Sequence, residues 1–283
     1  MFKNDNPSYH ISFLFEVKNF GRGLVKDVLA KIQLYTSHGV SKAKIIKSIP
    51  KCREFKDRQG NVFGLFKLGV LKPKAVQVLR VELEISPKVI LPPSSRDFGT
   101  LDNVGFFAKH KYCKSLFPFW VADSPEILQY VRSIVGDIKD VYQILTRFFS
   151  FLDGFIFREN LRTRRGALKT LEARYGDCDE FSDLFITFCR AVGIPARRVT
   201  GLFAKPNNPS NHAWTEALAP KIGWLPFDPA LRFFACSTPL HIPRKLEATN
   251  CEISDFNLRY KGQKHAEVKI YPVNMKPKIK RIS

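Results

Sequence analysis

The sequence has few of the residues that indicate a metal-binding or disulfide-rich protein. Close cysteine pairs are typical of structural zinc sites and redox motifs, and here no two cysteines stand two or three residues apart, so we expect neither a metal nor another cofactor. Scattered cysteines favour a reduced protein in the cytoplasm, although disulfides between distant cysteines stay an open alternative. The six cysteines are Cys52, Cys113, Cys178, Cys189, Cys236 and Cys251.

The sequence also lacks a long apolar run. Its most apolar stretch, FFSFLDGFIF, is interrupted by Asp153 and is far too short for a membrane span, which needs about 20 apolar residues. The first residues show no basic region followed by an apolar block, as a signal peptide would, and no internal repeat is visible. We therefore expect no transmembrane segment. With 283 residues, 45% of them hydrophobic, the chain is long enough for two domains.

Acidic residues are scarce beside basic ones. The chain has 26 Asp and Glu against 46 Lys and Arg, which gives a formal net charge of +20. The excess is spread over both halves, and the one dense basic run is KPKIKR at Lys276–Arg281. This charge is typical of a solvated surface, but it also allows attraction to nucleic acid or an anionic surface. No RNA-binding aromatic signature or helix-turn-helix pattern supports such a partner.

Residues 1–92 show the alternation of apolar and polar side chains that is typical of β-strands. Runs of this kind begin near Ile11, Val28 and Leu79, with turn-forming residues between them. Several short strands at this spacing predict an antiparallel β-sandwich of immunoglobulin-like size. The adjacent prolines of ILPPSSRDFG predict an extended boundary, and residues 93–120 are expected to be a linker and entry segment.

The pattern changes to helical periodicity after that segment. A helix is expected at DSPEILQYVRSIV, with Ser124 as its N-cap and Pro125 in its first turn. A second is expected after Gly136, and a short third one, ALKTLEAR, after Gly166. We therefore expect residues 121–283 to form a second domain that ends in the basic tail.

A further helix places two cysteines in different surroundings. Asp177 is a good N-cap, and Glu180 three residues later completes a capping-box pattern, so Cys178 falls at the first helical position. Cys189 falls on the apolar stripe and is expected to be a core thiol. The thiolate of a cysteine at a helix N-terminus is favoured by the helix dipole, but many such cysteines only cap helices. A catalytic role for Cys178 also requires a base.

The expected base is His212. It lies in the strand-like run NHAWTEA, and after the turn LAPKIG a second run, WLPFDPA, carries Asp228. A hairpin centred on Pro220 places these two side chains directly opposite each other, with their Cβ atoms about 4.5–5.5 Å apart. Such a pair is more often structural than catalytic. The other histidines stand in charged or loop-like contexts and are expected to be solvated: His10, His38, His110, His241 and His265.

These segments together resemble the catalytic core of the transglutaminase-like superfamily, which has a papain-like cysteine fold. The resemblance rests on Gly176–Cys178, FCRAVGIPARRVTG, NHAWTE and WLPFDPA, and it covers about residues 120–235. The sandwich ahead of it resembles the N-terminal β domain of some members, so the expected fold class is α+β. The resemblance implies that Cys178 is the nucleophile, His212 the base and Asp228 the residue that orients it.

The activity that this resemblance implies is thioester acyl transfer on a protein or peptide substrate. None of the three residues is substituted, so the sequence lacks the most obvious mark of an inactive homologue. A cysteine protease or amidase is the preferred expectation. Two alternatives stay open, which are transamidation of glutamine side chains and a non-catalytic module that binds a partner through the same groove and the basic surface.

Overall fold

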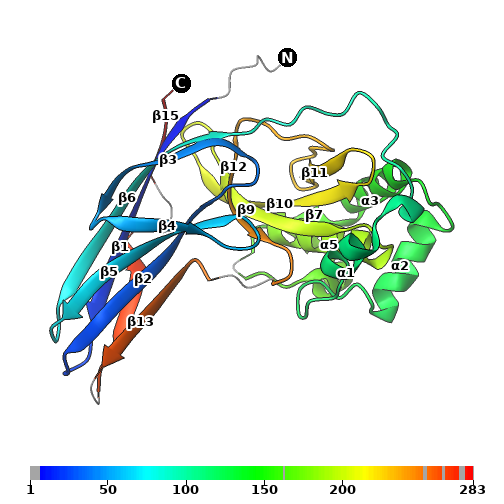
Figure 1. The fold of residues 1–283 in the computed structure, drawn as a ribbon. Helices are drawn as coiled ribbons and strands as arrows, with labels where there is room; N and C mark the ends of the chain where they lie inside the picture. Colours follow the sequence, from blue (N-terminus) through cyan, green and yellow to red (C-terminus); the bar gives the residue numbers. More distant parts are fainter. Residues whose placement is uncertain (1–6, 162, 251–253, 263–264, 274–277, 283) are drawn as a thin grey trace.

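The computed structural model describes residues 7–161, 163–250, 254–262, 265–273 and 278–282. A β-sandwich of two antiparallel sheets lies beside a second part, in which a four-stranded sheet packs against helices (Figure 1). This arrangement confirms the α+β class and the antiparallel β domain that the sequence predicted.

The sandwich is built from strands at both ends of the chain. One sheet has the order β14-β1-β6-β3, with β15 also paired to β1, and the other has the order β13-β2-β5-β4. The strands are β1 (Tyr9–Asn19), β2 (Val25–Thr36), β3 (Val40–Ile49), β4 (Cys52–Lys56), β5 (Asn61–Leu71), β6 (Val76–Pro87), β13 (Phe256–Gly262), β14 (Val268–Pro272) and β15 (Lys278–Arg281).

The predicted alternation accounts for the core of the sandwich. In β1 every second residue is buried, and the apolar side chains of Ile11 and Val17 leave almost no exposed surface. Val81 and Leu83 of the paired strand β6 are equally buried and face the same core. Because successive side chains of a strand point to opposite faces, one such strand supplies both the core and the polar outer surface.

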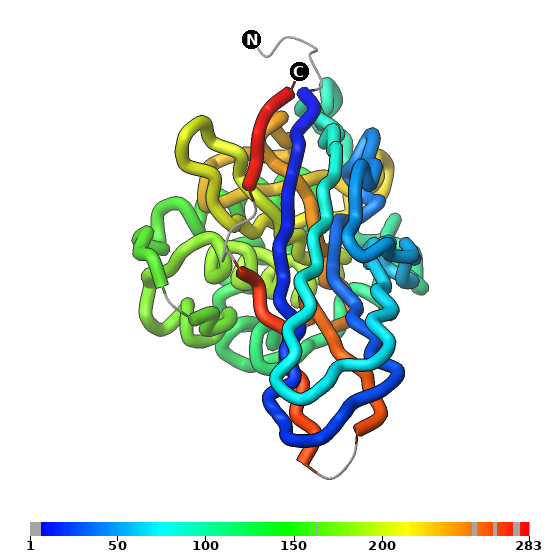
Figure 2. Tube along the Cα trace, turned by 90° about the vertical axis from the view of Figure 1, so that its left-hand side faces the viewer, coloured from blue at the N-terminus to red at the C-terminus, as the bar shows by residue number. Residues whose placement is uncertain are grey.

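The end of the chain belongs to the sandwich, which corrects the expected extent of the second domain. β13 pairs with β2, and β14 and β15 pair with successive parts of β1. Figure 2 shows β1 (blue) between β6 (cyan) and the two C-terminal strands (red). Residues 256–281 were expected to lie with the catalytic domain. Val268 and Ile270 instead bury their side chains in the sandwich core, and the other expected boundaries stay predictions.

The second part contains the remaining elements. Its sheet has the order β11-β10-β9-β12, and a separate two-stranded pairing joins β7 to β8. The elements are η1 (Leu101–Asn103), α1 (Phe106–Tyr112), α2 (Pro125–Val135), α3 (Val141–Phe155), β7 (Phe157–Arg158), α4 (Ala167–Ala173), β8 (Tyr175–Gly176), α5 (Cys178–Ala191), β9 (Ala196–Phe203), β10 (Ser210–Ala219), β11 (Gly223–Phe227) and β12 (His241–Glu247).

Helix α5 is the centre of the second part. Every residue from Glu180 to Arg190 is buried, because the sheet covers one side of the helix and α2, α3 and α4 cover the other. Phe181, Phe185 and Phe188 fill the space between these layers. Cys189 is fully buried among them, as expected for a core thiol. A helix held on all sides fixes the position of its first residue, Cys178.

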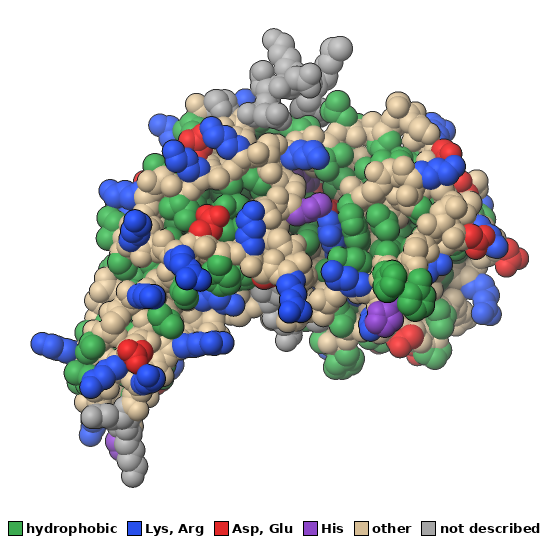
Figure 3. Space-filling view, in the orientation of Figure 1, with side chains coloured by type: hydrophobic (Ala, Val, Ile, Leu, Met, Phe, Trp, Pro, Cys, Tyr) green, Lys and Arg blue, Asp and Glu red, His purple; other side chains and the backbone are tan. Residues whose placement is uncertain are grey.

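The described residues bear on three further expectations. No helix among them is both long enough and apolar enough to cross a membrane. Their cysteines are free thiols, and Cys251 lies outside the described residues, as do Lys276 and Pro277 of the basic run. Lysine and arginine side chains are scattered over the face shown in Figure 3 and do not gather in one patch. The cytoplasmic location stays a prediction.

Candidate active site

The first turn of α5 is fixed by the predicted capping box. The Asp177 carboxylate accepts a hydrogen bond from the amide of Asp179 at 2.9 Å, and Glu180 Oε2 accepts one from the amide of Asp177 at 3.2 Å. Gly176 is required just before this turn, because a Cβ atom there would lie 2.3 Å from the Cβ of Glu180. Cys178 is therefore held, half-buried, at the N-terminus of the helix.

Two further contacts hold the same turn. Glu180 is buried, and its Oε1 atom accepts a hydrogen bond from the amide of Arg165 at 2.9 Å. Burial raises the pKa of Glu180 to about 7, although the two amides it accepts act in the opposite direction. The next acid, Asp179, forms an ion pair with Arg198 of β9. The turn that carries Cys178 is thus tied both to the preceding loop and to the central sheet.

His212 lies on β10, and its Nε2 atom is 2.6 Å from Oδ2 of Asp228. The contact was expected, but the expected hairpin register was wrong. The hairpin is centred on Lys221, with Ala219 opposite Gly223, so His212 has no partner on β11. Asp228 reaches the imidazole because it is the residue directly after β11.

A tight turn places the Asp228 carboxylate. The backbone of Asp228 pairs with that of Phe233 through hydrogen bonds of 2.8 and 3.0 Å. Inside this loop Oδ1 of Asp228 accepts the amide of Leu231 at 3.0 Å, which leaves Oδ2 directed to His212. The orientation of the carboxylate is therefore set by a local turn and not by cross-strand pairing.

The buried pair has the electrostatics of an ion pair. Burial alone would lower the pKa of His212, but hydrogen bonds to Asp228 and Cys178, and the charges of both groups, outweigh it and raise that pKa to about 10. Burial would likewise raise the pKa of Asp228, but its hydrogen bonds with His212 and His241 lower it to about 2. These shifts favour an imidazolium–carboxylate pair at neutral pH.

The imidazole of His212 connects the carboxylate to the thiol. Its Nε2 atom is taken by Asp228, which leaves Nδ1 as the ring nitrogen available to the Cys178 thiol on the same cleft. Trp214 lies on the same face of β10, and its ring stacks on the imidazole with the ring centroids 6.0 Å apart. Trp214 is itself buried, so this stacking supports the imidazole from the core.

One residue of the site was missed by the sequence prediction. His241, expected to be solvated, is buried, and its Nε2 atom lies 3.1 Å from the same Oδ2 atom of Asp228. It is the first residue of β12, in the run LHIPRKLE, where no alternation indicates which side chains point inward. His241 is brought to Asp228 because β12 pairs with β9. The residues around His241 in the sequence do not predict that pairing.

A cleft of about 410 Å³ opens beside Cys178 and His212. Its walls come from both parts of the molecule. The second part contributes the first turn of α5, β9, β10 and Arg244 and Lys245 of β12, whereas the sandwich contributes residues 12–15 of β1. A substrate in this cleft would therefore contact the sandwich as well as the candidate active-site residues.

Comparison with known proteins assigns a family to part of the chain. Residues 128–229 match the family model of the transglutaminase-like superfamily, and this segment contains Cys178, His212 and Asp228. Residues 128–229 are a transglutaminase-like core. The uncharacterized protein YebA of Bacillus subtilis (strain 168) is 32% identical over 77 residues, which are 22% of this chain and 10% of YebA. The aligned part thus spans about a tenth of that curated relative.

Two solved structures of low sequence identity were compared with this chain. A candidate cysteine protease from Cytophaga hutchinsonii superposes with a TM-score of 0.60 and 15% identity over 99% of each chain. The periplasmic domain of TgpA from Pseudomonas aeruginosa has a TM-score of 0.41 and 15% identity, over 77% of this chain and 87% of the other. The first of these extends the likeness in fold from the transglutaminase-like core to the sandwich.

Proposed function

We propose that this chain is a cysteine enzyme that transfers acyl groups through a thioester on Cys178, acting as a protease or amidase. One observation carries the proposal. The thiol at the N-terminus of α5 and the imidazole of His212 line the same cleft, and Nε2 of that imidazole lies 2.6 Å from the buried carboxylate of Asp228. Nucleophilic catalysis requires a nucleophile, a base and a group that orients the base in one place.

The first step forms the thioester. The Cys178 sulfur attacks the carbonyl carbon of a peptide or carboxamide, with its proton on His212. As the carbon–nitrogen bond breaks, His212 gives this proton to the departing amine or ammonia. Asp228 stabilises the imidazolium throughout, because its carboxylate is buried and ionised beside the ring.

The second step breaks the thioester. Water adds to the carbonyl carbon after losing a proton to His212, the carbon–sulfur bond breaks, and the thiol takes the proton back. The backbone amide of Cys178 is the expected donor to the negatively charged oxygen in both steps, because Asp177 already accepts the amides of Asp179 and Glu180.

Hydrolysis is preferred over transamidation because it needs no second binding place for an amine. The cleft is lined by polar and charged groups, among them Asn211, Arg244 and Asp255, and water can reach such a surface. Transamidation proceeds through the same thioester, so the two activities differ only in which nucleophile resolves it. The non-catalytic alternative predicts that no thioester forms.

The test is acylation of the chain by p-nitrophenyl acetate, followed by intact mass and peptide mapping. We expect one acetyl group on Cys178 of the wild-type protein and none on that site in Cys178→Ala. Cys113→Ala is the matched control, because Cys113 is also a partly buried thiol but is not among the residues that line the cleft. Acetylation at other cysteines with Cys178 unmodified would contradict the proposal.

The same protein then separates hydrolysis from transamidation. Glutamine-containing peptides are incubated with and without an excess of a primary amine, and their products are identified by mass spectrometry. A protease or amidase gives cleaved or deamidated peptide even with the amine present. A conjugate as the main product would establish the transamidase instead.

A further inference from the structure

His241 makes a contact with the candidate active site that the proposed mechanism does not use. Its ring is buried at the start of β12, and its Nε2 atom lies 3.1 Å from Oδ2 of Asp228. This oxygen is the one that also bonds Nε2 of His212 at 2.6 Å. Two histidines on different strands therefore share one carboxylate oxygen.

The hydrogen-bond partners of His241 determine where its proton lies. The backbone amide of Thr238 donates to Nδ1 of His241 at 3.2 Å, and the Thr238 hydroxyl lies 2.9 Å from the same atom. A backbone amide can only donate, so Nδ1 carries a lone pair and not a proton. The neutral ring then has its proton on Nε2, and His241 is a donor to Asp228.

This donor completes the set of contacts around the carboxylate. Oδ1 of Asp228 accepts the amide of Leu231 at 3.0 Å, while Oδ2 accepts from His212 and His241. A carboxylate that accepts from three donors on three different segments of the chain cannot rotate without losing a buried hydrogen bond. Among these donors, His241 is the side chain outside the proposed triad.

The same atoms raise the alternative of a metal centre. The ligand atoms of His212, Asp228 and His241 lie within 4.8 Å of one another, and two histidines with a carboxylate can bind a transition metal. A metal on Nε2 of a neutral His241 would require a proton on Nδ1. That proton would point at the amide hydrogen of Thr238, so the surroundings of this ring fit a hydrogen-bond donor and not a metal ligand.

Strand β12, which carries His241, is fixed on one side by a close approach to β9. Gly201 of β9 lies opposite both His212 and Pro243. A Cβ atom on this glycine would lie 2.0 Å from the carbonyl oxygen of Ile242, so any other residue would push β12 away. The glycine therefore allows His241 to come within hydrogen-bond distance of Asp228.

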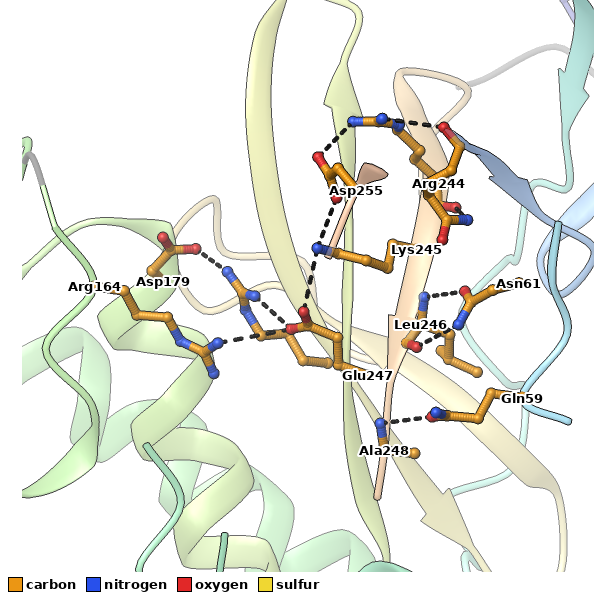
Figure 4. Close-up of polar contacts among 12 residues, drawn as sticks. Gln59, Asn61, Arg164, Asp179, Arg244, Lys245, Leu246, Glu247, Ala248 and Asp255 are labelled. Carbon is orange, nitrogen blue, oxygen red and sulfur yellow. Dashed lines mark hydrogen bonds and ion pairs between the residues drawn. The ribbon is translucent and has the colours of Figure 1, made fainter. Parts of the chain in front are cut away.

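The sandwich fixes β12 on its other side (Figure 4). Asn61 of β5 acts like a neighbouring strand, because its side chain accepts the amide of Leu246 at 2.7 Å and donates to the carbonyl of Leu246 at 2.9 Å. Gln59 accepts the amide of Ala248 at 3.0 Å. These side chains supply hydrogen-bond partners to backbone groups at the outer edge of β12, which would otherwise be unpaired, and they join β12 to the sandwich.

We propose that His241 is a positioning residue, which donates a hydrogen bond to Asp228 and holds its carboxylate in the orientation that His212 requires. The inference rests on the proposed function, since it assigns His241 to the same reaction. In this view the sandwich supports catalysis through β12, because the strand it anchors at Leu246 begins at His241.

The first test determines which ring nitrogen of His241 carries the proton. In protein labelled with ¹⁵N-histidine, the NMR shifts of the His241 ring should show protonation at Nε2 alone, and Thr238→Val should weaken this preference. This measurement does not depend on activity. A ring protonated at Nδ1, or at both nitrogens, at neutral pH would overturn the proposal whatever the enzyme does.

The second test measures the acetylation rate of Cys178 in three variants. His241→Phe keeps a ring but has no donor, whereas His241→Gln retains an N–H that can reach Asp228. His110→Phe is the matched control, because His110 is exposed on α1. Each variant is acetylated with p-nitrophenyl acetate across pH, and thermal melts report folding.

We expect the acetylation rate of Cys178 to fall about 10- to 100-fold in His241→Phe, the usual effect of losing a supporting contact, and to recover largely in His241→Gln. The acid limb of the rate profile should move to higher pH in His241→Phe, because Asp228 without this donor takes up a proton more easily. His110→Phe should match the wild type in rate and profile.

A purely structural role for His241 gives a different result. It would lower the melting temperature of both His241 variants and leave the acid limb in place, which would overturn the positioning role. Wild-type rates in folded His241→Phe would do the same. If wild-type Cys178 is not acetylated at all, the proposed function fails, and the positioning role fails with it even where the NMR result stands.

Discussion

His212 Nε2 lies 2.6 Å from Asp228 Oδ2, although no backbone pairing in the hairpin between them places these two residues opposite each other. The contact depends on the turn after β11, in which Leu231 and Phe233 hold Asp228. The pair is thus made by side-chain chemistry on a fixed turn, and it can be changed by substitution without disturbing the sheet.

Replacing Asp228 by asparagine should separate catalysis from folding. The two side chains have nearly the same volume, but an amide cannot stabilise the imidazolium as a carboxylate does. The corresponding change in a serine-protease triad costs about 10⁴-fold in turnover. The raised pKa of His212 favours the imidazolium already at rest, so we expect a loss of about 10- to 1,000-fold here. The measurement is acyl-enzyme formation followed by intact mass.

Three controls accompany this variant. Cys178→Ala should abolish acylation, His212→Ala should nearly abolish it, and thermal melts should show that Asp228→Asn is folded. Full activity in folded Asp228→Asn would mean that the carboxylate does not orient the base. Undiminished activity in Cys178→Ala would refute the enzyme proposal as a whole.

Cys178 should alkylate much faster than Cys189. The Cys178 thiol lines the cleft together with His212. Cys189 is fully enclosed in the core, and burial raises its pKa well above the ordinary value. Brief treatment with iodoacetamide at mildly acidic pH, followed by peptide mapping, should modify Cys178 first. Equal labelling of the two sites would contradict an activated thiol.

Stability should depend on pH through the His212–Asp228 pair. The pKa of His212 is raised from 6.5 to about 10, so its contribution to stability is complete below pH 6.5 and is lost as pH rises through about 10. The pKa of Asp228 is lowered from 3.8 to about 2, so its contribution is present above pH 3.8 and is lost as pH falls through about 2.

Urea unfolding across pH measures this dependence against Asp228→Asn, in which the ion pair is absent. The difference in the free energy of unfolding between the two proteins should be largest between about pH 4 and 6.5 and should shrink on both sides of that window. A difference that stays constant from pH 3 to pH 10 would show that the pair is not ionised in the folded protein.

Much of the site could be predicted because its signals are local. The capping box of Asp177 and Glu180 fixes Cys178 at the start of a helix within four residues of sequence. The two runs that carry His212 and Asp228 are joined by a short turn, so their proximity needs only a hairpin. The register was wrong because a three-residue turn can be centred on Pro220 or on Lys221, and the composition of LAPKIG does not choose between them.

The rest of the site depends on distant pairings that leave weak local signals. β12 carries buried charged residues such as Glu247, which binds Arg198 at 2.6 Å. Because such charged residues look like surface residues in the sequence, the pattern does not show that the strand is buried. The C-terminal strands are short and pair with β1 and β2 at the opposite end of the chain. The position of His241, and the contribution of the sandwich to the cleft, could therefore not be predicted from sequence alone.

The basic surface should not bind nucleic acid or anionic lipid strongly. On the face shown in Figure 3 the cations are scattered, and several arginines are already used in internal ion pairs, including Arg197 with Glu216 and Arg198 with Glu247. We expect no binding to RNA, duplex DNA or phosphatidylserine vesicles at about 50 mM salt, where phosphate contacts are strongest.

A charge variant checks the alternative. Replacing the exposed cations of β15 by glutamine, in Lys278→Gln, Lys280→Gln and Arg281→Gln, keeps the strand that pairs with β1. Binding that weakens steeply with salt would contradict our expectation. If these residues then contact phosphates, the slope of log K against log salt should fall by about 0.9 for each contact removed.

The last prediction concerns Asn61, through which the sandwich holds β12. Its side chain is buried and forms one hydrogen bond to the amide and one to the carbonyl of Leu246. Asn61→Ala leaves both backbone groups unsatisfied, at a cost of about 1–3 kcal/mol each, so the free energy of unfolding should fall by about 2–6 kcal/mol. Hydrogen exchange at the Leu246 amide should accelerate, and acetylation of Cys178 should slow in protein that is still folded, because β12 also positions His241. Asn208→Ala is the control, since Asn208 is exposed and only its backbone is seen to form a hydrogen bond. Unchanged exchange and acetylation in a destabilised Asn61→Ala would show that the sandwich stabilises the chain without supporting its active site.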